Sequence, residues 1–233
     1  LFGILLLFNK KIKKILGNIF LFFSGIDHLR EIILNKNLGT LQYLSATRTN
    51  LGPVRQDVNA VYDLATHDIS IFNYLLGSSP LEVSAVGMSY LKSNIEDVAF
   101  INLTYPQGIL ANIHVSWLDP KKVRQITLVG DLKMATWDDL GDLGPITIYD
   151  KGIVKQRYYH DFGEFQLLAR EGDITIPKIP MVEPLKSQNI AFIQSLKTGA
   201  TNISDGLFGL EIVKTLKAIN TSIELKGQSV AVE

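Results

Sequence analysis

Residues 59–77, NAVYDLATHDISIFNYLLG, are the stretch that decides the fold. At about 100° per residue, their apolar side chains gather into one broad stripe, which predicts a mostly buried helix that ends at Gly77. We expect this helix to begin near Asp57, because aspartate is a good N-cap residue. The stripe consists of Val58, Val61, Ala65, Ile69, Phe72 and Leu76, widened by Leu64, Ile71 and Leu75. The polar strip opposite consists of Asn59, Asp63, His67, Ser70 and Tyr74.

The polar strip holds one carboxylate and one imidazole, on Asp63 and His67. Four residues separate them, so both side chains project from the same side of the helix. A buried helix with such a strip can form the wall of an active-site cleft. The alternative is an ordinary solvated helix face, and spacing alone does not separate the two interpretations.

Composition excludes several classes of function. Lys plus Arg and Asp plus Glu number 23 each, so no global field attracts nucleic acid. The chain has no cysteine, which excludes a disulfide framework and a thiol nucleophile and which fits a cytoplasmic location. The four histidines are scattered and form no HExxH or His-x-His motif, so we expect no metal site.

The rest of the chain alternates between helical and strand-like patterns. Helices are predicted at about 24–36, 184–198 and 206–225, and loops with edge strands at 141–182. Strands are predicted at 40–50, 81–91, 98–105, 109–118, 123–129, 133–137 and 229–232. This order predicts one sheet with helices packed against it.

The predicted strand 109–118 alternates cleanly between apolar and polar side chains. One face carries Ile109, Ala111, Ile113, Val115 and Trp117, and the other carries Asn112, His114 and Ser116. Across the turn at 106–108, Asn102 and Thr104 continue the polar face. The sheet should therefore have a second, polar face, which can meet water, a ligand or another subunit.

Five segments resemble the Gfo/Idh/MocA family, which comprises nicotinamide-dependent oxidoreductases that act on sugars, cyclitols and sugar nucleotides. They are TRTNLGPVRQDVNAVYDLATHDISIFNYLLG at 47–77, EDVAF at 96–100, HVSWLDPKKVR at 114–124, IYDKG at 148–152 and SDGLFGLEIVK at 204–214. The resemblance covers about residues 17–233 and matches only the second half of such an enzyme. It implies an α+β fold with a predominantly antiparallel or mixed open β-sheet and helices packed on one face.

The resemblance also implies roles for the polar strip. The positions of Asp63 and His67 match the family's carboxylate and its proton-transferring histidine, and a histidine suits that role because its usual pKa lies near neutrality. Arg48 and Asn59 are the candidate substrate-binding residues, with an ordinary salt-bridge arginine as the alternative for Arg48. Arg124 could reach a phosphate of a sugar nucleotide. Asp68 points away from the strip and is expected to be a structural partner.

The cofactor implied is NAD or NADP, yet the chain contains no GxGxxG fingerprint. The nearest pattern, residues 206–209, lacks the first glycine pair and follows no strand. We therefore expect residues 1–16 to be the end of a dinucleotide-binding domain and residues 17–233 to be the substrate-binding and catalytic domain. On its own, this chain should be inactive.

Two other interpretations stay open. In the first, the domain is a non-catalytic module for oligomerisation or carbohydrate binding. Whether the domain is catalytic or not, we expect a homo-oligomer that uses the polar sheet face. In the second, residues 1–23 tether the protein to a membrane. Neither apolar run, 1–8 or 15–23, approaches the ~18–20 residues of a membrane span, so we expect no span.

Overall fold

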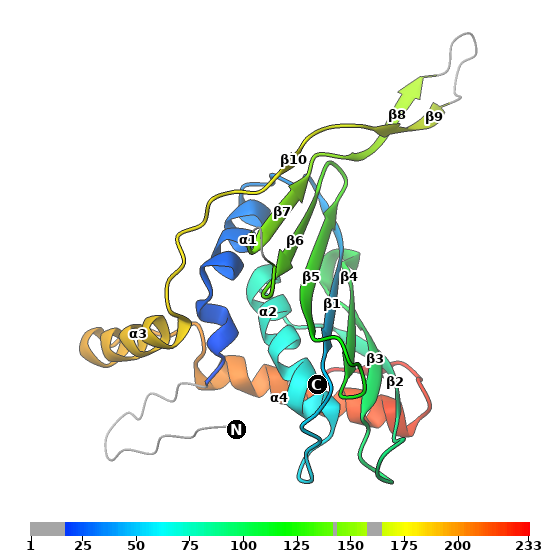
Figure 1. Cartoon of the computed structure of the whole chain (residues 1–233), viewed down its shortest axis with the longest axis vertical. Coiled ribbons are helices and arrows are strands. Elements are labelled where there is room, and N and C mark those ends of the chain that lie inside the picture. Colours follow the sequence, from blue (N-terminus) through cyan, green and yellow to red (C-terminus); the bar gives the residue numbers. More distant parts are fainter. Residues whose placement is uncertain (1–16, 142–143, 158–164) are drawn as a thin grey trace.

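The computed structural model describes residues 17–141, 144–157 and 165–233. Its centre is a nine-stranded sheet in the order β10-β7-β6-β5-β1-β4-β3-β2-β11 (Figure 1). Only β1 and β4 pair in parallel, and every other pair in this sheet is antiparallel. The strands are β1 Leu41–Thr49, β2 Glu82–Met88, β3 Val98–Thr104, β4 Leu110–Ser116, β5 Val123–Gly130, β6 Met134–Asp138, β7 Ile146–Tyr149, β10 Ile174–Thr175 and β11 Val230–Ala231. A separate two-stranded ribbon, β8 Gly152–Arg157 with β9 Phe165–Arg170, projects from one end.

Helices cover one face of the sheet. In Figure 1, α1 (Ser24–Leu34), α2 (Thr66–Leu76) and α4 (Gly206–Glu224) lie on this face, whereas α3 (Pro184–Thr198) extends away from it. The short helices η1 (Ile19–Phe22), η2 (Val61–Ala65) and η3 (Pro106–Gly108) join these elements. The predicted α+β class, with a mixed, mainly antiparallel open sheet and helices on one face, is confirmed.

Strand β4 shows why the sheet has two unlike faces. Ala111, Ile113 and Val115 are buried beneath the helices, as their alternation predicted. The outer face is less polar than expected, because Tyr43, Phe100 and Leu110 expose 46%, 47% and 58% of their side chains there. The predicted polar residues Asn112 and His114 do lie on this face, but Tyr43, Phe100 and Leu110 interrupt the row of polar side chains.

The helix that decides the fold starts later than predicted. The cap is Asn59, whose Oδ1 accepts a hydrogen bond from Tyr62 N–H at 3.0 Å. Asp57 instead pairs with Arg55 at 2.6 Å. The first turns form a π-helix, η2, which continues into α2, and the helix ends at Gly77 with φ +65°, as the sequence predicted. Wide turns of this kind occur frequently at functional sites.

The predictions about residues 1–16 fall outside the described residues. Within the part of the chain that the structure describes, no helix is long and apolar enough to cross a membrane.

Candidate active site

Asp63 and His67 border the same two pockets beside the helical layer. The first pocket has a volume of about 330 Å³ and the second about 180 Å³. The first is lined by Gly17, Asn18, Arg55, Asp57, Val58, Tyr62 and Thr66 besides the pair. The second is lined by Phe20, Arg48, Thr49, Asn50, Leu64, Lys122 and Arg124 besides the pair. The two side chains that the sequence placed on one strip thus share one cavity wall.

The carboxylate of Asp63 is fixed by groups from outside its own helix. Trp117, just after β4, donates its indole N–H to Oδ2 at 3.0 Å, and the Arg55 guanidinium donates to Oδ1 at 3.4 Å. Within the described residues, Asp63 makes no hydrogen bond with His67. The carboxylate therefore does not orient the imidazole in this state, and its role in the site stays a prediction.

The imidazole of His67 is packed against the Phe20 ring, with 4.9 Å between ring centroids. Its Nδ1 is buried and has no hydrogen-bond partner within the described residues. Burial lowers the pKa of His67 from 6.5 to about 3, and the positive charges of Arg48 and Arg124 contribute to the same shift. The pKa of His67 in this state therefore lies well below the usual value for histidine, and the imidazole is uncharged at pH 7.

Arg48 forms a buried ion pair. Its Nε and Nη2 donate to the two carboxylate oxygens of Asp68 at 2.9 and 2.7 Å, and the side chains expose only 4% and 1% of their surface. The structure confirms the salt-bridge interpretation of Arg48 and the structural role expected for Asp68. Arg48 still borders the second pocket, so its role as a substrate contact stays a prediction.

Both the oxygen and the nitrogen of the Asn59 side-chain amide form hydrogen bonds. Oδ1 caps the helix, and Nδ2 donates to Glu96 Oε2 at 2.7 Å. Asn59 borders neither of the two pockets described above. Its geometry favours a capping role, and the substrate-binding role predicted for it has no support from these contacts.

Sequence reasoning missed four residues that shape the site. Phe20, Arg55 and Lys122 come from segments that carried no periodic signal pointing to the helix 59–77. Trp117 was assigned to core packing, and it is buried. A signal was available for Trp117, because a buried indole N–H usually finds a hydrogen-bond acceptor.

The glycine-containing start of α4 does not fit the pyrophosphate of a nicotinamide dinucleotide. A pyrophosphate needs free backbone N–H groups at a helix N-terminus. At the glycine-containing start of α4, the Asp205 carboxylate already accepts from Phe208 N–H at 2.9 Å, and its charge would repel a phosphate. No group of three or more His, Cys, Asp or Glu side chains among the described residues could hold a metal ion.

Residues 26–136 match the sequence model of the GFO/IDH/MocA C-terminal domain. A UDP-N-acetylglucosamine 3-dehydrogenase from Acidithiobacillus ferrooxidans is 27% identical over 138 residues, which are 59% of this chain and 42% of that protein. The matched part is therefore less than half of that relative.

Solved structures share the fold. The GnnA UDP-N-acetylglucosamine 3-dehydrogenase from A. ferrooxidans aligns with a TM-score of 0.70 and 20% identity, over 90% of this chain and 61% of that one. An aldose-aldose oxidoreductase from Caulobacter crescentus aligns with a TM-score of 0.71 and 16% identity, over 94% and 64%. An oxidoreductase domain protein from Kribbella flavida aligns with a TM-score of 0.73 and 15% identity, over 93% and 66%. This chain spans less than two thirds of each.

Proposed function

We propose that this chain, which belongs to the Gfo/Idh/MocA family, is the substrate-binding and catalytic half of an oxidoreductase that oxidises a hydroxyl of a sugar, cyclitol or sugar nucleotide. The observation that carries the proposal is that Asp63 and His67 both line the same two pockets. The dehydrogenase relative, which acts on a nucleotide sugar by its name, supports the substrate class. Residues 17–233 would form this domain, and residues 1–16 would end a dinucleotide-binding domain.

His67 takes the role of general acid/base. Oxidation of a secondary alcohol needs a base within about 3 Å of the hydroxyl proton. The neutral imidazole lines both pockets and is ready to accept that proton at pH 7. Asp63 binds the substrate hydroxyls and stabilises the imidazolium that forms, because its carboxylate borders the same pockets.

NAD or NADP is the cofactor in this proposal, and its chemistry is to accept the hydride that leaves the carbinol carbon. It would be bound mainly by a dinucleotide-binding domain, since this sequence contains no GxGxxG fingerprint. The chain's own contribution is to hold the alcohol and move the proton.

A binding titration tests the proposal against a non-catalytic module. The double variant Asp63→Ala/His67→Ala is compared with the unsubstituted chain in calorimetric titrations of UDP-N-acetylglucosamine, N-acetylglucosamine and myo-inositol. We expect the double variant to lose affinity for the ligand that binds. An affinity unchanged for every ligand that binds would favour the module and would contradict the proposed site.

The outer sheet face supports a further part of the proposal, a homo-oligomer that buries this face in a second copy. The rings of Phe100 and His114 stack there with 4.5 Å between centroids, and the neighbouring Leu110 and Tyr43 are largely exposed. Solvent-exposed apolar groups that lie together on a surface mark association sites. Light scattering on Phe100→Glu tests it: we expect the mass to fall to that of a monomer, and an unchanged oligomer would contradict this face as the interface.

A further inference from the structure

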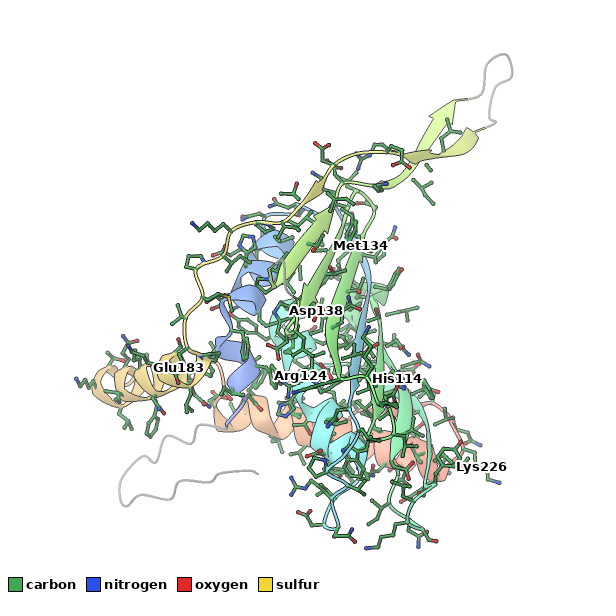
Figure 2. All side chains as sticks on the ribbon, in the orientation of Figure 1. His114, Arg124, Met134, Asp138, Glu183 and Lys226 are labelled. Carbon is green, nitrogen blue, oxygen red and sulfur yellow. The ribbon has the colours of Figure 1, made fainter. Side chains whose placement is uncertain are left out.

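Two arginines stand directly opposite each other at one end of the sheet. Arg48 on β1 and Arg124 on β5 are register partners, and both border the second pocket (Figure 2 labels Arg124). Like charges directly opposite each other destabilise a strand pair. Each arginine has its own carboxylate, because Arg48 pairs with Asp68 and Arg124 pairs with Asp139 at 2.8 Å. The fold thus places two guanidinium groups on neighbouring strands and pairs each with its own carboxylate.

These ion pairs leave donors for a ligand. Asp139 engages only Nη1 of Arg124, and the remaining N–H groups of that guanidinium make no hydrogen bond within the described residues. Lys122, on the exposed turn before β5, borders the same pocket and has no ion pair in the described part of the chain. The pocket lining therefore carries three cations against one carboxylate, that of Asp63.

We propose that the substrate carries a phosphate or diphosphate group that binds to Arg124 and Lys122 in the second pocket, while the reacting hydroxyl reaches His67. This inference rests on the proposed function and names its substrate class. Both pockets share Asp63 and His67, so one molecule can span them. The planar N–H fork of arginine matches the oxygens of a phosphate, and the lysine ammonium adds a point charge.

An anion at this position would also act on the imidazole. The charged groups that line the two pockets with His67 are Asp63 on η2, Arg48 on β1, Lys122 on the turn, Arg124 on β5, and Arg55 and Asp57 before η2. Arg48 and Arg124 both lower the pKa of His67. A bound phosphate offsets these charges, and we therefore expect it to raise that pKa and to make His67 a stronger base when the substrate is present.

The test compares three probes that share one sugar: UDP-N-acetylglucosamine, N-acetylglucosamine 1-phosphate and N-acetylglucosamine. Each is titrated by calorimetry into the 233-residue chain and into Arg124→Met, Lys122→Met and Lys121→Met. Lys121 is the matched control, because it is exposed next to Lys122 but does not border the pocket. NMR of the His67 ring gives its pKa with and without ligand, and the unfolding midpoint of each variant confirms that it is folded.

We expect both phosphorylated probes to bind more tightly than the neutral sugar, by about 10-fold or more, since hydrogen bonds to charged groups are strong. Arg124→Met should remove this advantage, Lys122→Met should reduce it and Lys121→Met should keep it. Equal affinity for the two phosphorylated probes identifies one phosphate as the anion, and tighter binding of the UDP-sugar identifies the diphosphate. Ligand binding should raise the pKa of His67.

Equal affinity for phosphorylated and neutral sugar, or the same effect from Lys122→Met and Lys121→Met, would overturn the inference. These outcomes are distinct from failure of the proposed function. Normal turnover with His67→Asn would remove the catalytic role and leave a phosphate-dependent affinity intact. Loss of turnover in His67→Asn, together with equal affinity for phosphorylated and neutral sugar, would support the catalytic role and overturn the phosphate site.

Discussion

His67 is a titratable group whose ring is partly buried and packs against Phe20. Its pKa is about 3 in the folded chain and near 6.5 when unfolded. Between these pH values the unfolded chain binds more protons than the folded chain, so the free energy of unfolding rises with pH. The stability that the neutral His67 contributes is fully present above about pH 6.5 and is lost as the pH falls towards 3. The slope approaches ~1.4 kcal/mol per pH unit. Urea unfolding measures how much the free energy of unfolding rises between pH 5 and pH 7. We expect this rise to be smaller by about 1–2 kcal/mol in His67→Gln than in the unsubstituted chain.

The matched control for this prediction is His28→Gln. His28 lies on α1 beside Glu31, at 3.5 Å, and borders neither pocket. We expect the free energy of unfolding of His28→Gln to change between pH 5 and pH 7 as much as that of the unsubstituted chain. An unchanged pH dependence in His67→Gln would show that the imidazole is not buried in its neutral form.

The Arg48–Asp68 pair gives a second prediction at the scale of residues. Asp68→Asn leaves the Arg48 charge buried without a counter-ion, which typically costs about 3–5 kcal/mol of stability. The double variant Arg48→Met/Asp68→Leu removes both charges and should recover most of that loss. Chemical denaturation measures both. A loss below about 1 kcal/mol in Asp68→Asn would contradict a buried pair, because that is the range of exposed pairs.

At the scale of elements, the end of β4 holds the π-helix η2 in place through one hydrogen bond. Trp117 donates to Asp63, so Trp117→Phe should lose a hydrogen bond to a charged group, worth about 1.5–3 kcal/mol. Trp137→Phe is the control, because Trp137 is fully buried but its indole N–H has no partner within the described residues. Urea unfolding should show the larger loss for Trp117→Phe. Equal losses would mean that only ring volume matters at both positions.

The sequence predicted the elements with strong periodicity and missed those set by single tertiary contacts. Strands β3 and β4 follow from alternation, which reports directly which side chains face the core. The π-turns of η2 could not be predicted, because their width depends on packing against β4 and on the cap at Asn59. The positions of Asp63 and His67 followed from helix spacing, whereas the lowered pKa of His67 depends on burial and on two arginines from other strands.

At the scale of the whole molecule, we expect substrate binding and cofactor binding to lie in different domains. The 233-residue chain should show no measurable heat of binding with NAD⁺, NADH, NADP⁺ or NADPH in calorimetry, because its sequence contains no GxGxxG fingerprint for the pyrophosphate. Tight binding of any of them would contradict the division of the chain at residues 16 and 17.

The central claim is that His67 moves the proton, and turnover of the full-length protein that carries this chain tests it most directly. The measurement compares kcat and KM of His67→Asn and of His28→Asn on a phosphorylated sugar, with the unfolding midpoint of each variant recorded. Loss of a positioned general base typically lowers the rate by ~10²–10⁴-fold. We predict a fall in kcat of this size in His67→Asn, a much smaller change in KM and normal kinetics in His28→Asn. Near-normal turnover of a folded His67→Asn would contradict the account.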